Sequence, residues 1–437
     1  MATLDRPQLR RLSLVRFDHQ GRSYALIEDP LGVFSTPVLV PLEVFLPICR
    51  HFDGRLSLEE IRRRVETETG KPLYPETLER LVVQLDQAMV LDGPTFASFL
   101  DSYRRSSRRP AALAGRSYAA DGALLRDQLT GYFQGPGGAA ASGGRTDPDA
   151  RVGAPKAEGS ARNGRLRGVL SPHIDFRRGG PVYTWAYRAL AEQPGIDTFV
   201  ILGVAHQYCR RRFALTFKDF ETPLGLVRTD RDYVQRIARA AGAEFFDDEL
   251  VHRGEHSIEF QTVFLQHVLG RNRQFQVVPI LVGSFHDCME RGIDPIDDSQ
   301  VSALVEALKA VERTSGKNVV FIGGIDLCHV GPEFGDSAPV DGRLETAVRR
   351  FDREMLGHAA AVDPARWFAT AAAVANSFRV CGLAATYTML HAIGPARGEL
   401  LKYDLALDER RTCGVSFASM VFHTLSVPGQ PEAGTDP

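Results

Sequence analysis

The stretch Asn318-Val-Val-Phe-Ile-Gly-Gly-Ile-Asp-Leu-Cys-His-Val-Gly331 decides the fold class, because an apolar run in it ends in a group of reactive side chains. Residues 318–324 have the length and the β-branched content of a strand that is buried on both faces. An amphipathic helix at about 299–312 precedes this strand, and such alternation is typical of a parallel sheet covered by helices. Ligands of these sheets bind at the carboxyl ends of the strands, which is where His329 stands.

The same alternation continues through most of the chain after Arg165. Further short apolar runs predict strands at 168–171, 198–203, 277–283, 400–407 and 414–422. Amphipathic stretches predict further helices at 181–190, 230–241, 342–357 and 382–393. Together they predict a three-layer α/β/α domain with a mostly parallel sheet.

Three histidines, His173, His206 and His329, each follow directly after one of the expected strands. The carboxyl ends of parallel strands converge on one crevice, so these imidazoles are expected to lie close together. Cys381 precedes an expected helix, and a helix N-terminus lowers the pKa of a thiol and favours the thiolate that binds metals. For each residue alone a capped or hydrogen-bonded structural role is the favoured interpretation, whereas the set of three histidines favours a site.

A second cluster, Glu255-His-Ser-Ile-Glu259, opens another expected helix. In one interpretation His256 lines a pocket, with Glu255 and Glu259 on the same side of the helix. In the other, the cluster is only a helix start, at which acidic side chains interact favourably with the helix dipole. The sequence leaves both interpretations open.

The overall composition excludes several classes of protein. Lys and Arg total 52 and Asp and Glu total 54, a net charge of −2, so there is no basic excess for binding nucleic acid. No run of 18 apolar residues predicts a membrane-spanning helix, and the N-terminus lacks the apolar core of a secretory signal. The six cysteines form no CxxC pair, which favours free thiols in a reducing cytoplasm.

Residues 1–103 are predicted to form a separate, small α+β domain with a winged-helix layout. Ser57 and Glu60 form a capping box, which marks the start of its second helix. The expected elements are a hairpin, a helix, a helix–turn–helix pair and a returning strand, at about 13–29, 41–51, 57–88 and 89–93.

The order of these signals resembles that of the small PqqD-like peptide-binding domains found beside radical-SAM enzymes. The shared features are Asp29-Pro30, Asp53-Gly54 and Ser57-Leu-Glu-Glu-Ile61. The resemblance implies a peptide ligand, and a packing domain without a ligand is an alternative. DNA binding through the second helix is a further alternative, which the acidic residues of these helices disfavour: Glu59, Glu60, Glu66 and Glu68.

The remaining segments differ in composition from these two domains. Residues 104–113 are basic and are predicted to be a linker that leads into a main domain at 114–425. Residues 135–164 are rich in glycine and alanine and predict a flexible insertion within that domain. Residues 426–437 are predicted to be a disordered tail.

Seven motifs follow one another along the main domain. They are Ala114-Gly-Arg-Ser-Tyr118, Ser171-Pro-His-Ile-Asp-Phe176, Ile201-Leu-Gly-Val-Ala-His206, Thr222-Pro-Leu-Gly225, Glu255-His-Ser-Ile-Glu259, Asp326-Leu-Cys-His-Val-Gly331 and Val380-Cys-Gly382. In kind and in order they resemble the motifs of the MEMO family, which includes the B component of the bacterial AmmeMemoRadiSam system. Two motifs depart from the family's common pattern, with Pro-His-Ile-Asp-Phe for Pro-His-Ala-Gly-Tyr and Gly-Val-Ala-His for Gly-Pro-Ser-His.

The resemblance implies the fold of the class III extradiol dioxygenases, whose Fe(II) site uses two histidines and a carboxylate. His173 and His206 match the two histidines, and Cys381 stands where the carboxylate would be, so these three are the expected metal ligands. Such a donor set suits iron (Fe2+), copper or zinc. A thiolate is a softer and more oxidisable ligand than a carboxylate, which weakens the inference of ring-cleaving chemistry.

The same resemblance implies the catalytic residues and the function. His329 matches an acid/base histidine, and Asp326 and His256 match further pocket positions. The expected function is that of an iron-dependent redox enzyme acting on a peptide or protein, with a radical-SAM enzyme and AMMECR1-like proteins as partners. Two alternatives are a non-catalytic peptide- or protein-binding module, favoured by a closed pocket, and a ring-cleaving dioxygenase, which oxygen uptake with catechols would identify.

Overall fold

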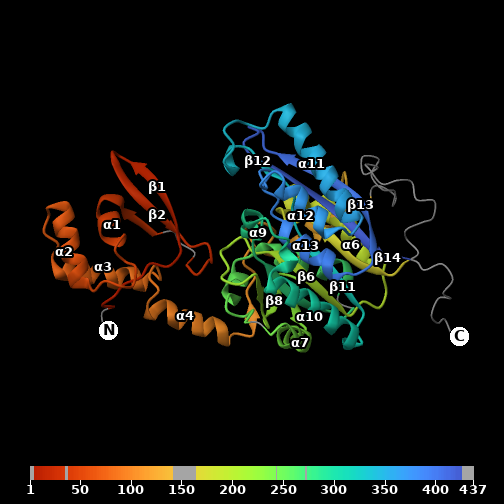
Figure 1. The fold of residues 1–437 in the computed structure, drawn as a ribbon, viewed down its shortest axis with the longest axis horizontal. Coiled ribbons are helices and arrows are strands. Elements are labelled where there is room, and N and C mark those ends of the chain that lie inside the picture. The colour runs from red at the N-terminus through yellow and green to blue at the C-terminus, as the bar shows by residue number, and fades with distance from the viewer. Residues whose placement is uncertain (1–3, 35–37, 141–163, 243, 271–272, 426–437) are drawn as a thin grey trace. The chain divides into compact units, whose positions relative to one another are not determined.

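The computed structural model describes residues 4–34, 38–140, 164–242, 244–270 and 273–425 of the chain. The chain divides into two compact units, Met1–Ser107 and Arg108–Pro437 (Figure 1). Residues 141–163 of the predicted insertion, and the whole predicted tail, lie outside the described part. The predicted linker spans the boundary between the units.

The second unit is built on a sheet whose centre is parallel. Five strands lie side by side in the order β5, β11, β6, β10 and β9, and each is parallel to its neighbour. Gly324 pairs with both Ser171 and Gly203, so the carboxyl ends of β5, β11 and β6 lie level with one another. The bounds of these strands are Leu166–Ser171, Val319–Gly324, Thr198–Val204, Gln276–Val282 and Gly225–Thr229.

Antiparallel strands flank this parallel centre. On one side β14 pairs with β5, β13 and β12, and on the other side β8 pairs with β9. Two further short strands belong to the sheet. β7 pairs with β10, and β4 pairs with β8. Strands β14, β13 and β12 span Gly414–Thr424, Ala396–Leu407 and His329–Val330. Strands β8, β7 and β4 span Asp219–Thr222, Phe213–Leu215 and Arg108–Arg109.

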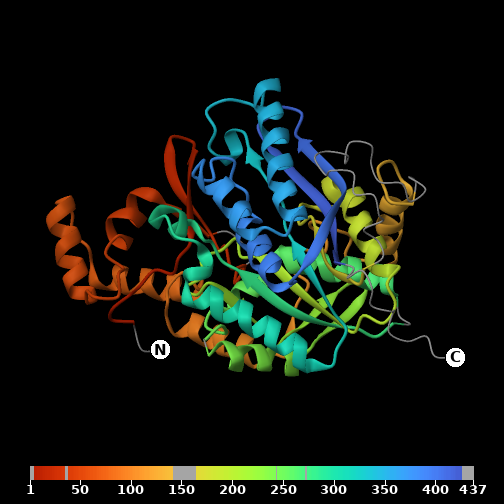
Figure 2. The ribbon, with the colours of Figure 1, turned by 45° about the vertical axis from the view of Figure 1, so that its right-hand side comes forward.

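Helices cover both faces of the sheet (Figures 1 and 2). On one face α5, α6 and α8 pack on each other and on β5, β6 and β8, and on the other face α7, α10, α11, α12 and α13 form a second connected layer. The bounds of these eight helices in chain order are Gly122–Gln134, Phe176–Ala191, Arg231–Ala241, His256–Leu269, Ser299–Ser315, Gly342–Ala360, Pro364–Ala372 and Leu383–Ala392. Short helices η3, α9, η4 and η5 span Glu249–Arg253, His286–Arg291, Pro295–Asp297 and Pro332–Phe334.

These layers explain the apolar runs in the sequence. Every residue of β6 and β11 is buried, since helices cover both faces of these strands. The prediction of an α/β unit with a mostly parallel central sheet is therefore confirmed. No helix in the described part of the chain is long and apolar enough to cross a membrane.

The first unit has a three-stranded antiparallel sheet in the order β1, β2, β3, followed by four helices. The capping box is confirmed, because the Ser57 hydroxyl accepts a hydrogen bond from the Glu60 backbone N–H and the Glu60 carboxylate accepts one from the Ser57 N–H. The strands span Ser13–His19, Arg22–Glu28 and Val38–Pro41, and helices α1 to α4 span Leu42–Cys49, Leu58–Thr69, Pro75–Gln87 and Pro94–Arg105.

The first unit also departs from the prediction at its C-terminal end. The returning strand predicted from Met89 is wrong, because only an isolated bridge between Leu9 and Leu91 forms there. Met89 itself has a φ of 56°, which is incompatible with extended backbone. The helix α4 was not predicted, and it carries the chain to within two residues of the boundary between the units.

Candidate functional site

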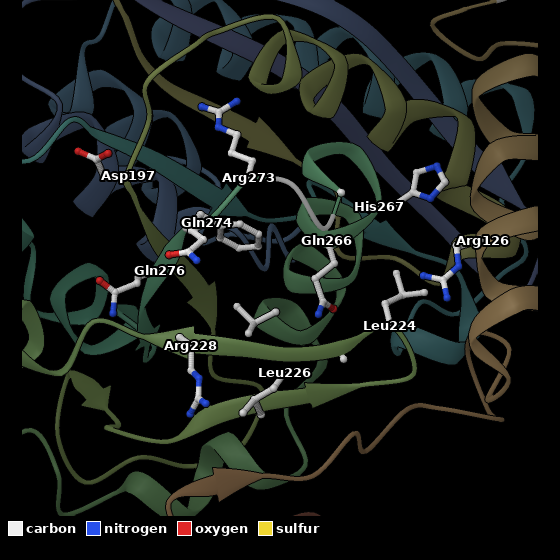
Figure 3. A pocket seen from close by; sticks show the side chains of 14 residues that line it. Arg126, Asp197, Leu224, Leu226, Arg228, Gln266, His267, Arg273, Gln274 and Gln276 are labelled. Atoms are coloured by element: carbon white, nitrogen blue, oxygen red, sulfur yellow. The ribbon is translucent and has the colours of Figure 1, made fainter.

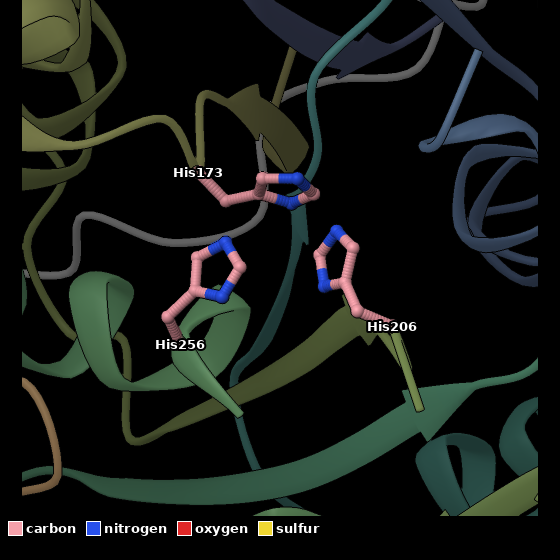
Figure 4. A group of neighbouring side chains, drawn as sticks. All are labelled: His173, His206 and His256. Carbon is pink, nitrogen blue, oxygen red and sulfur yellow. The ribbon is translucent and has the colours of Figure 1, made fainter. Parts of the chain in front are cut away.

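Three histidine rings meet at the carboxyl edge of the sheet (Figure 4). His173 comes two residues after β5, His206 comes two residues after β6, and His256 is the first residue of α8. Each ring offers one nitrogen, and these three nitrogens lie within 4.8 Å of one another. His173 and His206 thus lie close together, as expected from their positions after the strands. The third ring is His256, which the resemblance had placed in the pocket, and not His329.

Two glycines allow α8 to approach the strand ends this closely. A Cβ atom on Gly324 would lie 2.6 Å from the carbonyl oxygen of Ser257, and one on Gly203 would lie 2.6 Å from its hydroxyl oxygen. The Ser257 hydroxyl donates to the carbonyl oxygen of Val204 at 2.9 Å. The start of α8, and with it His256, is therefore fixed against the end of β6.

The backbone of β11 sets the orientation of His173. The Nδ1 atom of this ring lies 2.9 Å from the carbonyl oxygen of Gly324, which can only accept, so Nδ1 carries the proton. Nε2 is then left with a free lone pair in the neutral ring. Burial, followed by the charges of His206 and His256, lowers the pKa of His173 well below its ordinary value, which favours this neutral form.

Glu255 orients the other two rings. Its carboxylate lies 3.1 Å from Nδ1 of His206 and 3.1 Å from Nδ1 of His256, and it also accepts the backbone N–H of His206 at 3.0 Å. Burial alone would raise the pKa of Glu255, but the charges of the two histidines outweigh it and hold the pKa well below the ordinary range. An ionised, buried carboxylate thus accepts Nδ1–H from both rings. Burial alone would lower the pKa of His206, but the charge of Glu255 outweighs it and raises this pKa well above the ordinary value. A metal ion that binds Nε2 of His206 must therefore displace a proton.

Cys381 joins this group from the opposite helical layer. Its Sγ atom lies 3.2 Å from Nε2 of His173 and 3.6 Å from the carbonyl oxygen of Asp326. The residue stands two positions before the first residue of α13 and one before its N-cap, Gly382, as expected of a residue that precedes this helix. The expected lowering of the thiol pKa is not the net result, because burial raises the pKa of Cys381 despite its hydrogen bond to His206.

Asp326 and His329 are the other two residues predicted to be catalytic, and Asp326 contacts the cluster directly. The Asp326 carboxylate accepts the backbone N–H of His173 at 2.9 Å and lies 3.7 Å from its Nε2, and burial raises the pKa of Asp326 to about 6. His329 lies in β12, where Nδ1–H donates to the carbonyl oxygen of Leu327 at 3.1 Å. Burial, and more weakly the charge of His206, lowers the pKa of His329 to about 4, which favours a neutral ring.

A cavity of about 320 Å3 opens beside His206 and Cys381. Apolar residues such as Val282, Phe285 and Leu383 form part of its wall, and polar groups come from Ser284, His286, Asn376 and Arg379. A small organic ligand, or one side chain of a larger one, fits this volume. The cavity therefore borders two members of the His/Cys cluster.

A larger cavity of about 1000 Å3 lies at the other edge of the sheet (Figure 3). Asp197 and Gln276, at the amino ends of β6 and β10, line it together with Arg126, Arg228 and Arg273. Arg228 already pairs with Asp219 at 2.7 Å. With no clustered nucleophile or metal-ligand set among its described lining residues, this cavity is a weaker candidate than the histidine cluster.

The roles of two residues were missed by the sequence prediction. Glu255 was interpreted only as an acid near a helix start or a pocket, because its contact with His206 depends on the tertiary fold. Arg109 was assigned to the linker, whereas its side chain is fully buried beside Glu255 and Glu259. The only sequence signal for Arg109 is its position five residues before the Ala114-Gly-Arg-Ser-Tyr motif.

Comparisons with known proteins cover most of the second unit. A family profile described as "Memo-like protein" matches residues 109–421. A MEMO1 family protein of Methanopyrus kandleri is 31% identical over 329 residues, which cover 72% of this chain and 98% of the relative. A MEMO1 family protein of Aquifex aeolicus is 24% identical over 405 residues, covering 91% of this chain and 96% of the relative. One of Thermus thermophilus is 28% identical over 374 residues, covering 84% and 99%.

Proposed function

Because the chain belongs to the Memo-like protein family, we propose that it is a metal-dependent redox protein that holds iron at the histidine cluster. The observation that carries this proposal is the convergence of His173, His206 and His256, each with Nδ1 held by an acceptor and Nε2 left for a ligand. A histidine that binds a metal through one ring nitrogen usually donates the N–H of the other nitrogen to a hydrogen-bond acceptor. Copper and zinc accept the same donors.

The proposed ligands are His173, His206 and Cys381. Two imidazoles and a thiolate make a three-ligand site, and a bound ion would keep an open position for a substrate or an oxidant. His256 stands on the remaining side of the cluster and would orient a substrate or complete the ligand set. The raised pKa of the Cys381 thiol means that metal binding must displace its proton.

Asp326 and His329 are proposed to donate or accept protons during the reaction. The pKa of Asp326, at about 6, lets this carboxyl exchange a proton near neutral pH. The lowered pKa of His329 keeps its imidazole neutral, so that it can accept a proton from a substrate in the crevice. The cavity of about 320 Å3 beside Cys381 supports catalysis rather than a closed, purely structural site.

Metal analysis of anaerobically purified protein tests the proposal and its ligand set. Wild type is expected to hold close to one iron per chain. Cys381→Ser is expected to weaken metal binding by about 100-fold and to remove the thiolate charge-transfer band of the Co2+ form, since the soft ligand is lost. His256→Asn is expected to keep that band. Wild type that neither retains nor takes up a metal would overturn the proposal.

Cys209→Ser is the matched control, because Cys209 is a half-buried thiol that follows His206 in the sequence and stands outside the proposed ligand set. Its metal content and Co2+ spectrum should equal those of wild type. If His256→Asn loses the metal while Cys381→Ser retains it, the ligands are the three histidines and the thiol stands outside the site.

A second proposal concerns the first unit, which we suggest binds an extended peptide. Within the described residues, β1 pairs only with β2, and all seven of its residues are exposed. Leu14, Val15 and Phe17 are 50%, 47% and 47% exposed. A free strand edge with apolar side chains on both faces is the surface to which an added peptide strand pairs.

Selection from a random peptide library against the full chain tests this second proposal. Wild type is expected to enrich apolar, extended sequences, and Val15→Lys combined with Phe17→Lys is expected to lose them, because charge replaces the apolar contact. Thr67→Lys, at an exposed position of α2, is the control for added charge. Enrichment that is equal in the β1 variant and in wild type would contradict the assignment of the peptide to β1.

A further inference from the structure

Arg109, the second residue of the second unit, contacts the backbone that leads into the histidine cluster. We infer that Arg109 is a positioning residue for the proposed metal site, and this inference rests on the proposed function. The guanidinium is fully buried, and three of its neighbours are backbone carbonyls. Nε donates to the carbonyl oxygen of His252 at 2.8 Å, Nη2 donates to that of Glu255 at 2.6 Å, and Nη1 donates to that of Pro110 at 2.9 Å.

The first two of these acceptors bracket the turn that leads into α8. The carbonyl group of His252 belongs to η3 and that of Glu255 to the N-cap of α8, and one guanidinium holds both. The carboxylate of the same Glu255 contacts Nδ1 of His206 and Nδ1 of His256. A short chain of hydrogen bonds therefore runs from Arg109 through Glu255 to two of the three imidazoles.

A second carboxylate, one turn further along α8, fixes the arginine itself. The Glu259 carboxylate accepts a hydrogen bond from Nη1 of Arg109 and forms an ion pair with it, and both side chains are fully buried. Glu259 also accepts the backbone N–H groups of Ala112 and Leu113, at 3.1 and 2.9 Å, and the hydroxyl of Tyr118. Residues 109–118 and the first turn of α8 are thereby tied into one hydrogen-bonded body.

Only an arginine satisfies this geometry. A guanidinium presents five N–H donors in a planar fork, which here reaches three carbonyl oxygens and a carboxylate at once. A lysine carries the same charge on a single nitrogen and can pair with Glu259, but it cannot hold His252 and Glu255 in the same plane. Arg109→Lys therefore keeps the buried charge pair and removes the positioning.

The experiment compares Arg109→Lys with Arg167→Lys in the full chain. Arg167 also pairs with a carboxylate, Glu312, and donates to the carbonyl oxygen of Ile393 at 3.0 Å, but it lies near the amino end of β5, away from the cluster. The affinity of metal-free protein for Co2+, the absorption spectrum of the Co2+ form and the unfolding temperature are measured for both.

Arg109→Lys is expected to weaken Co2+ binding by about 10- to 100-fold and to shift the Co2+ spectrum, as loss of an outer partner of a ligand does. Arg167→Lys is expected to lower the unfolding temperature and to leave affinity and spectrum unchanged. Equal affinity and an unchanged spectrum in Arg109→Lys would overturn the inference. Equal losses of affinity in both variants would overturn it too, because they would indicate general destabilisation.

Two further outcomes are distinguishable. If wild type does not bind Co2+, the proposed function fails first, and the inference fails with it. If Arg109→Lys does not fold, Tyr118→Phe replaces it, because this change removes one donor to Glu259 without leaving a charge unpaired. Folded Tyr118→Phe is expected to shift affinity and spectrum in the same direction by a smaller factor, and no shift would overturn the inference.

Discussion

The combined His173→Ala and His206→Ala variant is expected to purify without iron. The Nε2 atoms of these rings are two of the three proposed donors, and a lone thiol cannot hold a divalent ion against water. Loss of a single outer partner already costs roughly 10- to 100-fold in metal affinity, so loss of two ligands should exceed that range. Metal content after anaerobic purification, together with Co2+ titration of the metal-free protein, gives the measurement.

His267→Ala combined with His358→Ala is the control for this variant. These two histidines lie in α8 and α11, outside the cluster, so that the control removes the same number of imidazoles. Its metal content should equal that of wild type. A cluster variant that retains as much iron as wild type and as this control would refute the metal site.

Glu255→Gln is expected to have the second largest effect on the site. The carboxylate only accepts hydrogen bonds, so it fixes the proton of both imidazoles on Nδ1. A glutamine amide can donate to one Nδ1 atom instead, which moves that ring's proton to Nε2 and blocks the lone pair that a metal needs. We expect metal affinity to fall by about 10- to 100-fold, measured by competition with a chelator of known affinity.

Asp298→Asn provides the matched control for Glu255→Gln. Both residues cap a helix, Glu255 at α8 and Asp298 at α10, where the Asp298 side chain accepts the N–H groups of Gln300 and Val301. The control should change stability by about 1 kcal/mol or less and leave metal affinity unchanged. If Glu255→Gln binds metal as tightly as this control, the carboxylate does not set the ring tautomers.

Periodicity in the sequence predicted the framework of the second unit well. Strands such as β6 and β11 are buried on both faces, so their apolar runs are uninterrupted and short, which distinguishes them from the helices between them. The short strands β4, β7, β8, β9 and β12 were not predicted. Such short segments carry little periodic signal, and these strands exist because a neighbouring strand offers them hydrogen bonds.

The candidate site was partly predictable for a related reason. Parallel strands end at a common edge, so the positions of His173 and His206 after their strands already implied that they meet. The convergence of His256 on them depends on the close approach of α8 at Gly203 and Gly324, which requires knowledge of the packing. Glu255 lies 49 residues from His206 in the chain, and no local pattern indicates that contact.

The buried pair of Arg109 and Glu259 was beyond the reach of sequence patterns. An arginine in a basic, proline-containing stretch is typically solvated, and only the surrounding carbonyl oxygens make its burial favourable. The same burial makes the pair sensitive to change, since breaking a buried ion pair from one side costs about 3–5 kcal/mol. Composition indicated a linker, whereas the contacts place Arg109 within the second unit.

The location of Arg109 limits how this chain can be recombined by gene fusion. The family profile begins at residue 109, and the first unit ends at Ser107, so the boundary between compact bodies falls directly before the arginine. Replacing the first unit by a different N-terminal module at that point would leave the contacts of Arg109 with Glu255 and Glu259 unchanged. A fusion point a few residues later, between Arg109 and Tyr118, would remove the arginine that donates to Glu259 at the start of α8. A fusion that keeps α8 in place must therefore retain the second unit from Arg109 onward.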